Sequence, residues 1–261
     1  MKHLNTYITE YIIKKKLDKP IDSEDHYKYF PETKQELINN VKELLFDKDE
    51  TNLNCIDTSK ITDMSRLFET YENINFDISE WDVSNVKDMN CMFFGCKLFD
   101  CDLSNWDVSN VKFMYTMFEG CNKFKGEGLE NWDVSKVEDM SYMFGDCYSL
   151  DCDLSKWNIS NVKNMSNMFM HCIKFNGDLS NWNTHNVENM TYMFANCTSF
   201  EGKGLDKWDV SNVQFMSSMF LRCKSFNCDL NKWNLNSNIK SMNYVFDECT
   251  SLKNKPKWYV E

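Results

Sequence analysis

The chain has 261 residues, 42% of them hydrophobic and 15% aromatic, and its formal net charge is −11. This acidic balance argues against nucleic acid and anionic membranes as partners and favours a basic or weakly charged one. No apolar run approaches the ~20 residues that a membrane span needs, and residues 1–19 lack the apolar stretch and cleavage site of a secretory signal. We expect a protein that is cytoplasmic as synthesised; association with a virion, or surface display by another route, is the alternative.

Residues 1–19 are predicted to form an amphipathic helix. Its apolar side chains recur at helical spacing along one side, and the segment ends in lysines that are followed by Pro20. The residues of this apolar stripe are Leu4, Tyr7, Ile8, Tyr11 and Ile12. We interpret this helix as an appendage that could act as a docking helix.

Residues 20–54 are predicted to form a helical cap. The stretch ETKQELINNVKELLF follows Pro31, a residue that is favoured in the first turn of a helix. Its apolar residues on one side are Leu37, Val41, Leu44 and Leu45. Because the terminal unit of a repeat array would otherwise expose apolar surface, we expect this helix to cover the first repeat.

Residues 55–261 form an internal repeat with a period of 25 or 26 residues. Methionine, phenylalanine and cysteine recur in the same register as tryptophan, and the first copy has Ile56 at the tryptophan position, which gives about eight copies. We expect the tryptophans in the core rather than exposed as platforms for sugars. They are Trp81, Trp106, Trp132, Trp157, Trp182, Trp208, Trp233 and Trp258.

Each repeat is predicted to contain a strand and a short helix. Leu103, Trp106, Val108 and Val111 follow the spacing of leucine-rich repeats, which places a strand at residues 105–109. The next apolar residues, up to Phe118, recur at the spacing of a helical face. The predicted fold is therefore an α/β solenoid of the leucine-rich-repeat type, with a parallel sheet on one face, short helices on the other and a helical N-terminal cap.

The cysteines are predicted to pack in the core. Seven of the twelve recur once per repeat, and cysteine is among the residue types that are most often buried. A soft metal ion shared between stacked thiolates, and a disulfide involving the second column of Cys101, Cys152 and Cys228, are weighed as alternatives. His171 and His185 are interpreted as surface substitutions. Because phosphate-binding loops, nucleophile elbows and zinc-protease motifs are missing, we expect no catalysis, no metal and no cofactor.

A column of acidic and amide residues follows the tryptophan position. On a strand these residues would face away from the core, where stacked carboxylates repel one another. Two interpretations are open: each side chain caps the turn two residues on, or the column binds a cation or a basic partner. The column contains Asp82, Asp107, Asp133, Asn158, Asn183 and Asp209, and the same face is lined by Asn105, Asn131 and Lys156.

The repeat VEDMSYMFGDCYSLDCDLSKW resembles those of BspA-like leucine-rich proteins and of mycoplasma-type surface lipoproteins. The resemblance covers residues 56–258, and TKQELINNVKELLF resembles the usual N-terminal flank of that family. It implies an adhesion or host-interaction module without chemistry of its own. The start of the chain also resembles open reading frames of gut bacteriophages and their hosts, which implies a role in a virion or in the host cytoplasm.

Two functions are expected from these observations. The first is a non-catalytic interaction module whose exposed face holds a protein or a polysaccharide such as a surface glycan. The second is a structural or assembly protein, capable of self-assembly, that docks onto a particle through its N-terminal helix.

Overall fold

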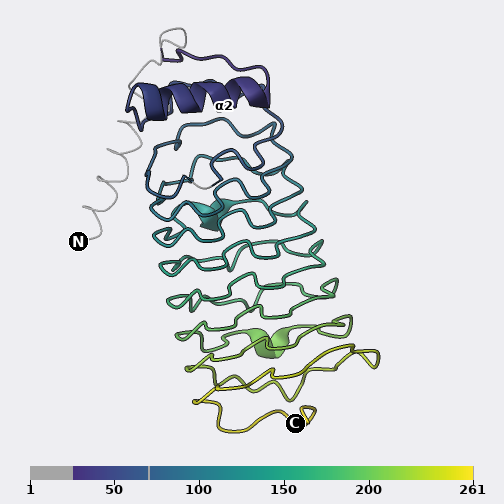
Figure 1. Ribbon diagram of the computed structural model, residues 1–261. Helices are drawn as coiled ribbons and strands as arrows, with labels where there is room; N and C mark the ends of the chain where they lie inside the picture. The colour runs from purple at the N-terminus through teal and green to yellow at the C-terminus, as the bar shows by residue number, and fades with distance from the viewer. Residues whose placement is uncertain (1–25, 70, 261) are drawn as a thin grey trace, which may run out of the picture.

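The computed structural model describes residues 26–69 and 71–260. The chain winds into a stack of coils, with one α-helix across the N-terminal end and the C-terminus at the opposite end (Figure 1). Within these residues the helical elements are α2 (Lys34–Lys42), the π-helical turn η1 (Glu43–Asp47) and the 3-10 turns η2 (Leu129–Asn131) and η3 (Leu205–Lys207). The predicted docking helix, with Leu4, Tyr7, Ile8, Tyr11 and Ile12, lies outside the described residues.

Helix α2 covers the first coil of the stack (Figure 1). Thr33 is its N-cap, and the side chains of Thr33 and Glu36 each accept a hydrogen bond from the other's backbone N–H in a capping box. Lys34 Nζ reaches the first coil and lies 2.9 Å from Asp63 Oδ1. The apolar side chains that α2 and η1 bury are Leu37, Val41, Leu44 and Leu45.

Each coil, which we call a rung, is a series of tight turns. In the third rung the N–H of Trp106 donates to the carbonyl of Leu103 (3.1 Å), and that of Met117 donates to Met114 (3.3 Å). Such bonds to the third residue back place both ends of a turn on the core side. Rungs one to eight are numbered by their first methionine, at Met64, Met89, Met114, Met140, Met165, Met190, Met216 and Met242.

The predicted α/β solenoid with a parallel sheet is wrong. Residues 105–109 form no strand, and parallel pairing among the described residues is limited to isolated single residues. Two such pairs, Tyr29–Ile56 and Asn52–Asp77, lie near the N-terminal end, and the others join the residues directly before the first methionines. Only alternate N–H groups point along the stack: Cys91 donates to the Tyr115 carbonyl (2.9 Å), whereas Met92 turns back to Met89 (3.2 Å). We call the paired residues that directly precede the first methionines the bridge column: Asp63, Asp88, Phe113, Asp139, Asn164, Asn189, Phe215 and Ser241.

The predicted short helices of the repeat are also wrong, because residues 111–118 form no helix. Thr116 has a φ of 57°, in the left-handed region, which cannot continue a right-handed helix. The helical spacing of Met114, Met117 and Phe118 instead comes from consecutive turns. The residue two positions after the first methionine is left-handed in each rung, and we call these residues the left-handed column: Arg66, Cys91, Thr116, Tyr142, Asn167, Tyr192, Ser218 and Tyr244.

The repeated aromatic residues form continuous columns inside the stack. The phenylalanines that follow the second methionine, or the residue in its place, stack with ring centroids 5.2–5.8 Å apart between neighbouring rungs. Each indole N–H donates to a leucine or isoleucine carbonyl about one rung back, at 2.7–3.3 Å. From Trp81 to Trp233 the tryptophans are 2–5% exposed, which confirms their predicted core position.

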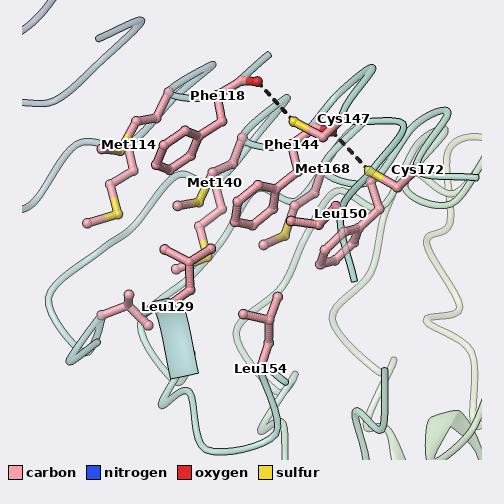
Figure 2. Close-up of a cluster of buried hydrophobic side chains, with 14 of the residues drawn as sticks. Met114, Phe118, Leu129, Met140, Phe144, Cys147, Leu150, Leu154, Met168 and Cys172 are labelled. Atoms are coloured by element: carbon pink, nitrogen blue, oxygen red, sulfur yellow. Dashed lines mark hydrogen bonds between the residues drawn. The ribbon is translucent and has the colours of Figure 1, made fainter. Parts of the chain in front are cut away.

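The cysteine column lies in the same core. Each thiol donates to a phenylalanine carbonyl of the preceding rung at 2.8–3.1 Å, as Figure 2 shows for Cys147 and Cys172. Burial raises the pKa of Cys96 to about 12, so this thiol stays protonated at neutral pH. All twelve cysteines are free, including Cys101, Cys152 and Cys228. The prediction that the repeated cysteines pack in the core is confirmed.

The two longer repeats accommodate their extra residue at a glycine. Gly128 and Gly204 have φ of 93° and 88°, and η2 and η3 begin directly after them. A Cβ on Gly128 would lie 2.2 Å from the backbone nitrogen of Ser104 in the preceding rung. Glycine is therefore required here both for its backbone conformation and for the close approach of two rungs.

Candidate binding face

The bridge column and the left-handed column lie side by side on one long side of the stack, which we call the ladder face. Asn189 and Phe215 of the bridge column line the same groove as Tyr142 and Tyr192 of the left-handed column. The rungs are joined here through the backbone, since the N–H groups of Tyr142 and Tyr192 donate to the next rung at 2.9 and 3.0 Å. The tyrosine side chains are therefore not needed for pairing between rungs, whereas in the bridge column Asn164 Nδ2 also donates to Asp139 Oδ2 of the preceding rung at 3.2 Å.

Large aromatic side chains alternate with small polar ones along the left-handed column. From rung four to rung eight the order is Tyr142, Asn167, Tyr192, Ser218 and Tyr244. Tyr192 is 39% and Tyr244 63% exposed, and within the described part of the chain none of the three tyrosine hydroxyls has a hydrogen-bond partner. The backbone hydrogen bonds between rungs imply the spacing of paired strands, about 4.8 Å, which would set these tyrosines about 10 Å from one another.

The three tyrosines occupy an unfavourable backbone conformation. Tyr142, Tyr192 and Tyr244 have φ of 57°, 55° and 59°. For residues with a side chain this region costs roughly 1–2 kcal/mol, and asparagine, which Asn167 places in the same column, tolerates it best. Bulky residues held at such positions point to a role other than folding.

A groove of about 460 Å³ lies between Tyr142 and Tyr192. Ser166 and Asn167, which are both 8% exposed, form its floor. The remaining lining residues are Met170, Asn189, Thr191 and Phe215. The lining therefore combines aromatic rings with amides and hydroxyls and contains no charged side chain, and its volume lies in the range of ligand-binding sites.

The ladder face carries carboxylates in rungs one to four and none at these columns in rungs five to seven, before Asp247 follows the core phenylalanine in rung eight. The bridge column has Asp63, Asp88 and Asp139 in the first four rungs, and Asn164, Asn189, Phe215 and Ser241 in the last four. The residue after the core phenylalanine changes from Glu69 and Glu119 to Met170, Ala195 and Leu221. In a chain with a net charge of −11, rungs five to seven thus present a neutral surface at these columns.

Two phenylalanines interrupt the bridge column. In five other rungs an aspartate or asparagine of this column accepts the N–H two residues on, at 2.8–3.1 Å. Phe113 and Phe215 cannot make this bond, and Phe113 is 48% exposed. Lys240 Nζ lies 5.1 Å from the centre of the Phe215 ring, within the range of a cation–π contact. A turn-capping side chain has therefore been replaced twice by an aromatic one on the ladder face.

The predicted acidic column caps its own turns. We call it the turn column, and each of its predicted oxygens accepts the N–H two residues on, at 3.0–3.2 Å. In one such turn, hydrogen bonds from the side chain and the backbone N–H of Ser109 hold the pKa of Asp107 below its ordinary value. The turn-capping interpretation is confirmed for Asp82, Asp107, Asp133, Asn158, Asn183 and Asp209; binding by this column stays a prediction.

The predicted neighbours of the turn column are partly brought together. A groove of about 320 Å³ is lined by Asn131, Lys156, Asp133 and Asn158, together with other residues of rungs four and five. Asn105 instead donates from Nδ2 to the carbonyl of Ser79 in the preceding rung, at 3.2 Å. The turn column and its neighbours thus form a polar edge in which much of the hydrogen-bonding capacity is used internally.

The histidines of the repeats pair with aspartates across rungs. His171 Nδ1 lies 2.7 Å from Asp146 Oδ1, and His185 Nδ1 lies 2.8 Å from Asp209 Oδ2. Over residues 26–69 and 71–260, no group of three or more histidine, cysteine or acidic side chains could hold a metal ion. No helix in this part of the chain is long and apolar enough to cross a membrane.

The aromatic residues of the ladder face were missed by reasoning from the sequence. The available signal was variation: the left-handed column changes from rung to rung, whereas the surrounding M-x-x-M-F pattern hardly changes. Tyr142, Tyr192 and Tyr244 are aromatic residues at a variable position of the repeat. A strand-and-helix interpretation placed this column on the helical side of the repeat and left it without a role.

Comparison with known proteins identifies the family of the chain. No curated protein and no solved structure matches it. Three overlapping stretches, at residues 36–151, 116–204 and 142–259, match the family described as Mycoplasma protein of unknown function, DUF285. These matches cover the end of the cap and nearly all of the repeats, so the chain belongs to this mycoplasma-type repeat family.

Proposed function

We propose that the chain is a non-catalytic interaction module that binds a macromolecular partner, a protein or a surface glycan, on its ladder face. The observation that carries the proposal is the set of tyrosines at left-handed positions: Tyr192 and Tyr244, which are exposed, and Tyr142, which is half-buried. None of the three hydroxyls has a hydrogen-bond partner among the described residues, and the one ring contact is that of Tyr142, which meets Tyr115 edge to face with the ring centroids 6.3 Å apart. Rigidly placed aromatic residues that reach solvent dominate many binding interfaces.

Several other features support binding by this face. The stack holds its ladder face through backbone bonds and a continuous aromatic core, so the tyrosines are in place before a partner arrives. The resemblance of the repeats to BspA-like proteins favours an adhesion or host-interaction role, and the resemblance of the chain's start to phage reading frames would place that role on a virion or in a host cell.

The test is a capture experiment on protein and glycan fractions of bacterial and host surfaces. We would compare the intact chain with the double variant Tyr142→Asn/Tyr192→Asn, in which both residues become the asparagine already accepted at position 167. Tyr148→Asn is the matched control, because Tyr148 is 42% exposed but does not line the groove. Capture that is lost only in the double variant is expected; capture that is equal in all three proteins would refute the proposal.

A second function, in assembly, is favoured by two unpaired backbone groups in rung eight. Arg222 of rung seven donates to rung eight at 2.8 Å, but the N–H groups of Tyr244 and Phe246 in rung eight have no partner among the described residues. Such an edge can accept another chain segment. Under this proposal the protein forms concentration-dependent oligomers in sedimentation, and deletion of residues 1–19 abolishes incorporation into a particle; a monomer at every concentration, incorporated normally after deletion, would refute it.

A further inference from the structure

We infer that the groove between Tyr142 and Tyr192 binds a neutral, extended β-1,4-linked polysaccharide. This inference rests on the proposed function and names its ligand. It is carried by three properties of the ladder face: the spacing of its tyrosines, the chemistry of the residues between them, and the lack of charge in the groove lining.

The spacing of the tyrosines matches every second sugar of such a polymer. Tyr142 and Tyr192 lie two rungs apart, about 10 Å if rungs are spaced like paired strands. In an extended β-1,4-linked chain successive sugars face opposite ways, so one face repeats every two sugars, over a closely similar length. A ring in each of these rungs would therefore meet the same C–H face of alternate sugars, to which the negative face of an aromatic ring is attractive.

The residues between the rings suit the intervening sugar. Ser166, Asn167, Asn189 and Thr191 offer amide and hydroxyl groups within the same groove. Each of these side chains can both donate and accept, as a sugar hydroxyl requires. A small residue at Asn167 also leaves room between the two tyrosines, whereas a third tyrosine there would fill it.

The charge of the groove distinguishes a neutral glycan from other partners. A basic peptide would be expected on the carboxylate-bearing rungs, where Asp63, Asp88 and Asp139 line the bridge column, and not on rungs five to seven. An acidic polysaccharide would be repelled by a chain with a net charge of −11. An uncharged polymer with apolar faces and polar edges is the partner that the groove fits.

The tyrosine series also predicts how long the ligand is. Tyr244 continues the alternation after Ser218, so three rings cover rungs four to eight. A chain of five or six sugars would engage all three rings, whereas a disaccharide would engage one or two. We therefore expect the affinity to rise with chain length up to about the hexasaccharide.

The experiment is calorimetric titration of the full chain with β-1,4-linked gluco- and xylo-oligosaccharides of two to six sugars. The α-1,4-linked glucose hexamer is the control ligand, because its curved chain cannot follow a straight row of rings. Tyr192→Asn should weaken hexasaccharide binding at least about tenfold, and Tyr148→Asn should leave it unchanged. Circular dichroism of the variants verifies that each is folded.

The outcomes separate this inference from the proposed function. No binding of any β-linked hexamer, equal binding of the α-linked hexamer, or equal affinity in Tyr192→Asn would each overturn the glycan inference. If the capture experiment then still showed a protein that binds the intact chain and not the Tyr142→Asn/Tyr192→Asn variant, the ladder face would remain a binding face with a protein partner. If both experiments failed, the proposed function would fall as well.

Discussion

Two exposed columns run along the same stack, and their side chains are used differently. In the turn column, the side-chain oxygens of Asp107 and its equivalents accept a hydrogen bond from the turn that contains them. In the left-handed column, Tyr142, Tyr192 and Tyr244 have hydroxyls that bind nothing in the described residues and rings that reach solvent. The first column repeats almost without change, whereas the second varies from rung to rung.

This contrast separates residues that make the rung from residues that the rung displays. A position that every rung needs for its own geometry is filled by the same residue type each time. A position whose backbone bonds already hold the rungs together is free to vary, and a costly residue found there has another purpose. In this repeat protein, repetition therefore reports on folding and departure from repetition reports on binding.

The core columns should carry most of the stability. Phe144 is fully buried, and its ring lies 5.7 Å from those of both Phe118 and Phe169. Phe144→Ala should lower the free energy of unfolding by about 3–5 kcal/mol, because it opens a cavity in the middle of the aromatic column. Urea denaturation measures this change. A loss below ~1 kcal/mol would contradict the assignment of the repeated phenylalanines to the core.

The turn column should contribute a smaller amount through its hydrogen bonds. Asp107→Ala removes the acceptor of the Ser109 N–H and should cost about 0.5–1.5 kcal/mol. Asn234 occupies the same column but has no such bond among the described residues, so Asn234→Ala is the control and should have little effect. Equal effects of the two substitutions in thermal denaturation would show that turn capping is not what this column does.

The left-handed column should respond in the opposite direction. Tyr192→Asn replaces a bulky residue at a φ of 55° with one that tolerates this conformation better. The free energy of unfolding should therefore stay the same or rise by at most ~1 kcal/mol, and the melting temperature should not fall. Hexasaccharide binding should nevertheless weaken at least about tenfold. Differential scanning calorimetry of the variant decides the point, and a clear destabilisation would mean that Tyr192 serves the fold.

Acidification should expose the smallest effect, at Asp209 of the turn column. Bonds from Ser211 and His185 lower the pKa of Asp209 from 3.8 to about 2. Because the folded pKa is depressed, the stabilisation is present above about pH 4 and is lost as the pH falls through about 2. The difference in melting temperature between the intact chain and Asp209→Asn should therefore shrink from pH 4 to pH 2; a constant difference would contradict this.

The sequence predicts the repeat and its core but not the path of the chain within a rung. The period places the tryptophans and cysteines in register, and burial follows from their chemistry. Apolar residues three apart, such as Leu103 and Trp106, fit a leucine-rich strand, a helix or a tight turn equally well. The left-handed Thr116, which decides for turns, has no signature in its residue type.

Of the candidate binding residues, the sequence predicts the roles only of those that recur in every repeat. Turn capping by Asp107 follows from a common local pattern of aspartate two residues before a serine N–H. The role of Tyr192 depends on which side of the rung it leaves, and that side was fixed by a strand and a helix that the structure does not contain. Knowledge of the turn geometry was needed before the alternating tyrosines could be read as one face.

The most direct test of the account compares the two columns in one binding experiment. The intact chain, Tyr142→Asn/Tyr192→Asn and Asp82→Lys/Asp107→Lys/Asp133→Lys would be immobilised and exposed to the same surface extracts and β-1,4-linked hexasaccharides. The account predicts that the tyrosine variant loses capture while the lysine variant retains it. Capture that survives in the tyrosine variant and disappears in the lysine variant would contradict it and assign binding to the turn column.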